Sequence, residues 1–411
     1  MSSFVVALDV GGTSMKGGLV SSTGQVLLTD RRPTPRAEGP LRVVEAISAF
    51  IDALARAGHG TPAGVGLAVP GLVTSDTAVY SANIGWKDVP ATDFTNLNVP
   101  VRLGHDVRTG GLAESVLGAG RAEPDFLFLP IGTGIAGAVI IGHHPYGGSS
   151  GWGGEIGHIP VFPSGERCAC GQIGCLETYA SAASVARRYA ERLSRAASLR
   201  PTTPHGTPTT EDPRASAPGA TTPASAPRPA TPVSAPASTT SASAPRPATP
   251  ASAPGPAIPV SAPASTTSAS APGPAIPVSA PASTTSASAP RPATAEDVVA
   301  LAMRGDPDAS AIWDDALEAL SLALASYTLL MDPSSIIIGG GLAEAGPALF
   351  DPLAERLQER LTFRTAPPLR RAALGVNAGM LGAALLGWQA AGVPDAGASW
   401  SLDVLRSPSV P

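Results

Sequence analysis

Residues 200–293 constrain the fold more than any other part of the chain. They hold 23 of the 44 prolines, and the twelve-residue sequence SAPASTTSASAP occurs in them three times, beginning at Ser234, Ser261 and Ser279. A segment without hydrophobic periodicity cannot bury enough apolar surface to offset the entropy lost on ordering. We therefore expect a disordered, partly polyproline-like insertion without a role in function. The globular fold is then confined to the sequence on either side.

The globular part carries one short pattern twice. Phe4–Leu8 is an apolar run that leads into a glycine turn and return strands at 17–20 and 25–29. Phe126–Pro130 is a second such run, followed by another glycine turn and a return strand at 136–141. Paired glycines after a β-branched run are typical of a strand that reverses in a tight turn. The repetition predicts two lobes of related topology with a cleft between them.

Hydrophobic spacing indicates the remaining elements. The expected helices are 41–57, 107–117, 177–194, 295–303, 309–330, 349–361 and 378–389, and the further strands are 65–69, 101–103, 335–338 and 372–374. We expect the residues after Gly392 to form a frayed tail.

Composition excludes several classes of function. The net charge is −5, aromatic residues make up 4% and no block of Lys or Arg is present, so we expect no nucleic-acid partner. No apolar run approaches the length of a membrane span, and the start, Met1-Ser2-Ser3-Phe4, has no basic region before an apolar stretch. The three cysteines lie within eight residues, too close and odd in number for a disulfide framework. We expect a cytoplasmic protein with no membrane partner.

The glycine turns are candidate phosphate sites. The stretch from Asp9 to Lys16, DVGGTSMK, places bare backbone amides, a hydroxyl and a cation where a strand reverses. Taken alone it is better explained as an ordinary hairpin turn, and it is not a P-loop because the spacing differs. Two further glycine turns, Gly132-Thr133-Gly134 and Gly339-Gly340-Gly341, favour a nucleotide held between the lobes.

Asp106 is the candidate general base. It stands at a strand-to-helix junction, where a carboxylate could accept a proton from an attacking hydroxyl during phosphoryl transfer. The alternative is that Asp106 is the N-cap of a helix beginning at Val107. The two roles are compatible.

A Cys3His set indicates a metal. Cys168, Cys170 and Cys175 follow His158 with glycines between them, which is the composition of a closed, tetrahedral, structural zinc site. The alternative is three inert buried thiols. Glu155 and Glu177 flank these ligands, and carboxylates held rigidly beside an imidazole suit a polyhydroxylated ligand.

These motifs resemble the ROK family of sugar kinases and repressors, within the actin-like ATPase superfamily. The residues that carry the resemblance are Asp9-x-Gly-Gly-Thr-x-x-Lys16, Pro70-Gly71, Asp106, Gly132-Thr133-Gly134, Gly154-Glu-Ile-Gly-His158, Cys168-x-Cys-Gly-x-x-Gly-Cys-x-Glu177 and Gly339-Gly-Gly341. The resemblance implies an α/β fold of the actin-like (ribonuclease H-like) type with two lobes. The expected parts are an N-terminal lobe (1–118), a C-terminal lobe in two pieces (119–199 and 294–396) around the insertion (200–293), and a tail (397–411). The last helix is expected to pack on the N-terminal lobe.

The resemblance also implies roles for individual residues. Asp106 would take the proton from the sugar 6-hydroxyl while ATP donates its γ-phosphoryl group. The expected sugar contacts are Gly71, Asn83, His105, Glu155, His158 and Glu177, and the expected nucleotide contacts are Asp9, Gly11, Gly12, Thr13, Lys16, Gly132, Thr133, Gly134, Gly339, Gly340 and Gly341. Asp9 would act on the magnesium shell, and His158, Cys168, Cys170 and Cys175 would hold structural zinc. Family members are often dimers or tetramers, so a homo-oligomer is expected.

His105 departs from the family pattern, which commonly has Asn before the catalytic Asp. An imidazole changes the contact with a sugar hydroxyl, so the substrate is less defined than the reaction. Glucose is the default, and N-acetylglucosamine or N-acetylmannosamine is the alternative. A sugar-sensing repressor would need a DNA-reading domain ahead of Phe4, and a silent sugar-binding protein would have a disrupted Asp106 or first turn. The sequence favours the kinase over both.

Overall fold

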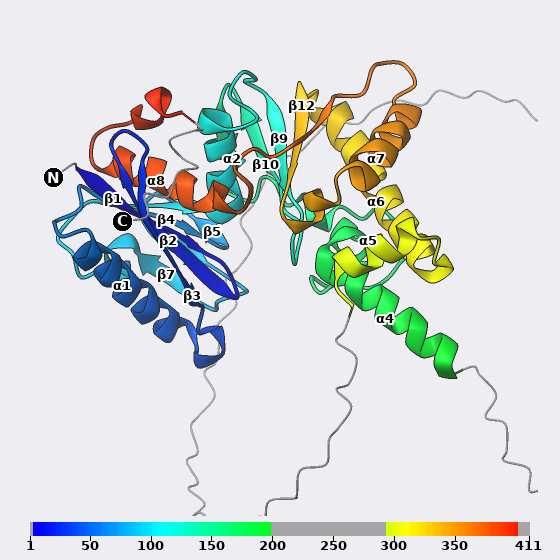
Figure 1. The fold of residues 1–411 in the computed structure, drawn as a ribbon, viewed down its shortest axis with the longest axis horizontal. Coiled ribbons are helices and arrows are strands. Elements are labelled where there is room, and N and C mark those ends of the chain that lie inside the picture. Colours follow the sequence, from blue (N-terminus) through cyan, green and yellow to red (C-terminus); the bar gives the residue numbers. More distant parts are fainter. Residues whose placement is uncertain (1–2, 199–292, 402–411) are drawn as a thin grey trace, which may run out of the picture. The chain divides into compact units, whose positions relative to one another are not determined.

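The computed structural model describes residues 3–198 and 293–401, so the expected insertion lies, except for Ala293, outside the described residues. Both described ranges belong to the same unit of the chain, and Figure 1 labels their helices and strands.

The first sheet is built around β1 (Phe4–Val10), whose apolar side chains are buried. Its strand order is β3-β2-β1-β4-β8, in which β2 and β3 run antiparallel to β1 while β4 and β8 run parallel. The other bounds are Ser14–Ser21 (β2), Val26–Pro33 (β3), Val65–Val69 (β4) and Val101–His105 (β8).

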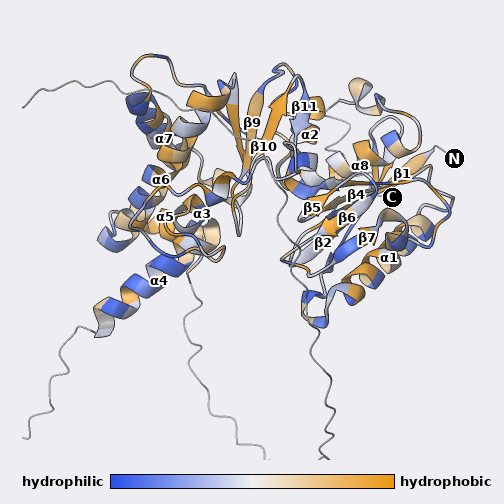
Figure 2. Cartoon of the chain, turned by 180° about the vertical axis from the view of Figure 1, so that it is seen from behind, coloured by the Kyte–Doolittle hydropathy of each residue, from blue (hydrophilic) through white to orange (hydrophobic). Residues whose placement is uncertain are grey.

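The second sheet repeats this plan. Its order is β11-β10-β9-β12-β13, again with a central strand, an antiparallel meander on one side and parallel strands on the other. The bounds are Phe126–Pro130 (β9), Ala138–Ile141 (β10), His144–Tyr146 (β11), Ser335–Gly339 (β12) and Leu369–Arg371 (β13). The predicted relation between the two halves is confirmed. Figure 2 shows the apolar character of β9 and β10.

Helices cover both sheets. The bounds are Pro40–Ala57 (α1), Asp106–Leu117 (α2), Leu176–Ala180 (α3), Ala182–Ser198 (α4), Ala295–Met303 (α5), Pro307–Met331 (α6), Pro347–Arg360 (α7) and Ala378–Ala390 (α8), with short 3-10 turns at Arg36–Glu38 (η1), Ala91–Phe94 (η2), Ile156–His158 (η3), Gly341–Ala345 (η4), Gly375–Asn377 (η5) and Ala396–Ser399 (η6).

Helix α8 packs on the first sheet and on α2, although it lies near the end of the chain. Gly66 in β4 permits this approach, because a Cβ there would collide with the Ala383 carbonyl of α8. A third sheet, β5-β6-β7 (Leu72–Val73, Thr77–Tyr80 and Lys87–Pro90), was not predicted.

Three local predictions are wrong. The helix expected over 177–194 is two helices, because Ser181 has an extended backbone and its Oγ accepts the Ser184 amide N–H, which starts α4. The last strand is Leu369–Arg371 and not 372–374. The residues after Gly392 are not frayed as far as the structure describes them, since Trp400 is 1% exposed and its Nε1 donates to the Ser22 carbonyl at 3.0 Å.

Within the described residues, no helix combines the length and the apolarity required to cross a lipid bilayer.

Candidate functional site

A cavity of about 640 Å³ lies at the carboxyl ends of β1, β4, β8 and β9. Parallel strands bring their carboxyl ends to one edge of a sheet, which is where α/β folds place their ligand sites. Its lining includes twelve of the residues predicted from the sequence: Gly12, Gly71, Asn83, His105, Asp106, Gly132, Thr133, Gly134, Glu155, His158, Cys170 and Glu177.

Asp106 is the first residue of α2, and the predicted capping role is wrong because the N-cap is His105. The Asp106 side chain retains 28% exposure, and its Oδ1 accepts the Val107 amide N–H at 2.8 Å. Burial of the carboxylate raises the pKa of Asp106 above its usual value. A carboxyl group with a raised pKa at the wall of a cavity is suited to accepting a proton.

His105 presents a neutral ring to the cavity. Burial, together with the nearby Arg108 guanidinium, lowers the pKa of His105 to about 4. The Arg108 amide donates to His105 Nδ1 at 3.4 Å. Asp106 Oδ1 lies 3.3 Å from the same Nδ1, so this nitrogen faces both an N–H donor and a carboxylate acceptor.

Arg108 was not predicted. It lies in the first turn of α2, and its Nη1 donates to the carbonyls of Gly151 and Gly153 at 3.0 and 3.2 Å. These bonds hold the glycine-rich loop that carries Trp152, a cavity-lining side chain that is 53% exposed and was also not predicted.

The second glycine turn is held by Glu177. The Ile135 amide donates to Glu177 Oε2 at 2.7 Å, and a Cβ at Gly134 would lie only 2.5 Å from the same oxygen. The third turn lies beside the second, since Ile131 donates its amide N–H to the Gly339 carbonyl at 2.9 Å.

The first glycine turn is braced by the residues after β3. Thr34 Oγ1 donates to the Gly11 carbonyl at 2.7 Å, and the Thr34 amide donates to the Thr13 carbonyl at 3.0 Å. Arg36 in η1 lies close to this turn, with Nη1 3.8 Å from the position that a Cβ on Gly12 would occupy. The cation nearest Gly12 is therefore one that the sequence did not single out.

Asp9 and Lys16 lie opposite each other in β1 and β2, behind the turn. Burial and the neighbouring Asp106 raise the pKa of Asp9 to about 6, and Lys16 opposes this shift. Lys16 Nζ donates to the Val376 carbonyl at 3.1 Å. The first turn of α8 packs against the Asp9 carboxylate at Gly379.

A second cavity, also about 640 Å³, is formed by Gly339, Gly340 and Glu344 on one side and by residues 371–377 on the other. The predicted nucleotide residues are thus divided between two cavities. The remaining predicted residues, Asp9, Gly11, Thr13, Lys16, Gly341, Cys168 and Cys175, line neither.

The four predicted metal ligands are gathered together, with His158, Cys168, Cys170 and Cys175 offering donor atoms all within 4.8 Å of one another. The Cys170 and Cys175 sulfurs are 3.7 Å apart, and Cys168 Sγ is 3.8 Å from His158 Nδ1. A tetrahedral zinc ion with Zn–S bonds of about 2.3 Å separates its sulfurs by about 3.8 Å. The donor set and its spacing therefore fit such an ion. Cys170 is exposed, which disagrees with the alternative of three buried thiols.

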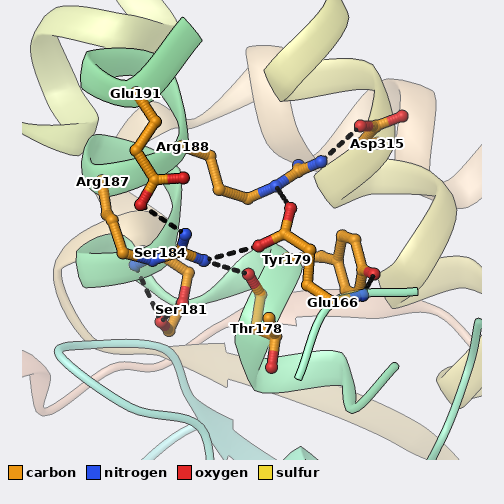
Figure 3. Close-up of polar contacts among 9 residues, drawn as sticks. All are labelled: Glu166, Thr178, Tyr179, Ser181, Ser184, Arg187, Arg188, Glu191 and Asp315. Carbon is orange, nitrogen blue, oxygen red and sulfur yellow. Dashed lines mark hydrogen bonds and ion pairs between the residues drawn. The ribbon is translucent and has the colours of Figure 1, made fainter. Parts of the chain in front are cut away.

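Glu166 connects the loop that contains the three cysteines to helix α4 (Figure 3). Its carboxylate accepts from Arg188 Nε at 2.7 Å and Arg187 Nη2 at 2.9 Å, and Arg188 also bonds Asp315 of α6 at 2.8 Å. Partial burial alone would raise the pKa of Glu166, but the hydrogen bonds from the two arginines outweigh it and lower the pKa. Arg188 also lies over the ring of Tyr179, 4.7 Å from its centroid.

The duplicated sheet order, with a cavity at the strand ends, defines an α/β protein of the actin-like ATPase fold. The chain belongs to the ROK family, whose model matches residues 5–209 and 269–390. It is 35% identical over 190 residues to a glucokinase of Halalkalibacterium halodurans, covering 44% of this chain and 58% of that protein. It is 32% identical over 184 residues to the xylose repressor of Bacillus subtilis, covering 43% and 48%. The chain thus spans between 48% and 58% of the length of these two curated relatives.

The crystal structure of the ROK hexokinase from Thermus thermophilus superposes with a TM-score of 0.62 at 26% identity, covering 94% of this chain and 98% of that one.

Proposed function

We propose that this protein is an ATP-dependent hexose kinase that transfers the γ-phosphoryl group to the 6-hydroxyl of glucose or a close relative. The observation that carries the proposal is the lining of the first cavity. Asp106, two glycine turns and the side chains expected to bind a sugar all line it. Membership of the ROK family and the similarity to a glucokinase and a hexokinase support it.

The sugar hydroxyls would be held by Asn83, Glu155 and Glu177, with the His105 ring as an added polar contact. Asp106 would accept the proton of the 6-hydroxyl as that oxygen attacks the γ-phosphorus and ADP leaves. The raised pKa of Asp106 favours uptake of this proton. The amides of the two turns around Gly12 and Gly132 would meet the donor phosphates.

Residues of the second cavity would take the nucleoside. Gly340 has a φ of +75°, and a Cβ there would collide with the Ile131 carbonyl, so the third turn packs closely on the second. A nucleotide whose phosphates lie at the second turn could therefore place its base beyond the third.

Two metals are part of the proposal. The Asp9 carboxylate, behind the first glycine turn, would contact the water shell of a magnesium ion, and magnesium would screen the phosphate charge. His158, Cys168, Cys170 and Cys175 would hold structural zinc. Since His158 Nδ1 faces Cys168, its Nε2 would be left for the sugar.

A panel of sugars tests the proposal. ADP release from the full chain is measured with glucose, mannose, fructose, N-acetylglucosamine and N-acetylmannosamine, with 6-deoxyglucose as a matched control that lacks the acceptor hydroxyl. We expect sugar-dependent release with at least one hexose and none with 6-deoxyglucose. Release that is the same with and without sugar contradicts the proposal. Light scattering of the same sample tests the predicted dimer or tetramer.

A second candidate is a sugar-responsive regulator without transfer activity. The similarity to the xylose repressor of Bacillus subtilis supports it. Sugar binding by calorimetry together with absent ADP release would favour this candidate. The location of Asp106 in the cavity with both turns favours the kinase.

A further inference from the structure

Glu114 is a buried carboxylate that the proposed reaction does not use. It lies in the last turn of α2 and has 0% exposure. A carboxylate is placed in a protein interior only where hydrogen bonds compensate its lost hydration.

The partners of Glu114 are all backbone amides. Oε2 accepts the N–H of Ala119 at 2.8 Å and of Ala373 at 3.1 Å, and Oε1 accepts the N–H of Leu374 at 2.9 Å. A Cβ at Gly118 would collide with Oε2, so the carboxylate lies tightly against the end of its own helix. Both oxygens are thus directed at one short segment, 259 and 260 residues further along the chain.

That segment forms one wall of the second cavity, because Ala373 and Leu374 belong to the residues 371–377 that line it. The preceding amide, of Ala372, donates to the Ile338 carbonyl of β12 at 2.9 Å. Without Glu114 the next two N–H groups would lose their acceptors at the point where the chain leaves the sheet. The position of this wall therefore depends on one side chain.

We propose that Glu114 is a positioning residue for the nucleotide, which it serves by fixing the 373–374 backbone. The inference rests on the proposed function, since it takes the second cavity as the nucleoside site. Helix α2 begins at Asp106 and carries Glu114 eight residues later, about 12 Å along the axis. The single helix α2 would then determine the positions of both the proton acceptor, Asp106, and the backbone segment 373–374 that lines the nucleoside site.

The experiment compares Glu114→Gln with Glu123→Gln in the full chain. Glutamine keeps the shape of Glu114 but replaces one acceptor oxygen by an NH2 group, which cannot accept an N–H. Glu123 is a matched control. It lies in the loop after α2, and its carboxylate also bonds to residues at the second sheet, Ser334 and Arg370. Glu123 does not line the second cavity. ATP affinity is measured by calorimetry, and the KM values for ATP and for the sugar by ADP release.

We expect Glu114→Gln to raise the Kd and the KM for ATP about tenfold, which corresponds to about 1.4 kcal/mol. The KM for the sugar should stay within about twofold, and Glu123→Gln should leave both KM values within about twofold. Unchanged ATP affinity in a folded Glu114→Gln protein overturns the inference. Equal changes in both KM values also overturn it, because they indicate a general loss of structure.

Hydrogen exchange of the unmodified protein keeps the inference testable if Glu114→Gln does not fold. ATP should slow exchange at the amides of Ala373 and Leu374, and absence of this protection overturns the inference. A wild-type chain that binds no ATP refutes the nucleotide site and this inference together. Wild-type transfer with normal ATP affinity in the variant refutes the inference alone.

Discussion

Replacing Asp106 with Asn should separate catalysis from stability. Asn keeps the oxygen that accepts the Val107 N–H at 2.8 Å, so the start of α2 is retained. A general base contributes about 10²- to 10⁴-fold in rate, which equals about 2.7–5.4 kcal/mol of activation free energy. We expect kcat to fall by about that factor.

The same substitution should leave the free energy of unfolding unchanged or increased at pH 7. Burial raises the pKa of Asp106, so the folded protein holds the charged carboxylate less favourably than the unfolded chain does. The neutral amide removes this cost. The advantage of the variant should be absent below the ordinary pKa of 3.8 and should grow as the pH rises through the folded-state pKa.

The assay is kcat by ADP release combined with urea unfolding at pH 3.5 and pH 7. Asp93→Asn is the matched control, because Asp93 is exposed in η2 and should alter neither quantity. A variant that keeps a rate within about threefold of wild type refutes Asp106 as the base. A large loss of stability at pH 7 refutes the argument from burial.

Three further predictions concern the side chains around Asp106. Glu177→Gln replaces the charge-assisted bond that holds the second turn by a neutral one. Such bonds are worth about 1.5–3 and about 0.5–1.5 kcal/mol respectively, so kcat/KM measured by ADP release should fall by up to about one order of magnitude. Cys170→Ser removes one metal ligand, and mass spectrometry of the purified protein should show less than one zinc per chain together with a lower Tm; full zinc content would contradict the ligand assignment. Asp9 has its pKa raised from 3.8 to about 6, so wild type loses stability relative to Asp9→Asn as the pH rises through that window, by up to about 3 kcal/mol; equal urea midpoints at pH 7 without nucleotide would refute this.

The duplicated fold was predictable because each half opens with the same strand and glycine turn. The strand order follows once β4 and β12 are placed beside β1 and β9. The sheet β5-β6-β7 was not predictable, since Leu72–Val73 is too short to show a period. The break between α3 and α4 at Ser181 had only a weak sequence signal, which is a serine three residues before Ser184. Hydrophobic spacing alone does not reveal this break.

The sequence predicted site residues that act through recognisable side-chain motifs. It missed residues whose hydrogen-bond partners are backbone groups. Sequence motifs located twelve of the residues that line the first cavity, but not Trp152. Arg108 donates to the Gly151 carbonyl, and Glu114 accepts the Ala373 N–H. Backbone groups are the same in every residue, so no sequence pattern marks these partners. The packing of Trp400 on Ser22 likewise depends on a contact 378 residues apart in sequence.

Nuclear magnetic resonance of the reaction product tests the central claim most directly. The full chain is incubated with ATP, magnesium and the best sugar of the panel, and the ³¹P signal of the product is assigned through its couplings to sugar protons. We predict a phosphomonoester coupled to the two protons on carbon 6, formed by wild type and not by Asp106→Asn. Phosphorus recovered only as inorganic phosphate, or attached equally by both proteins, would contradict the claim.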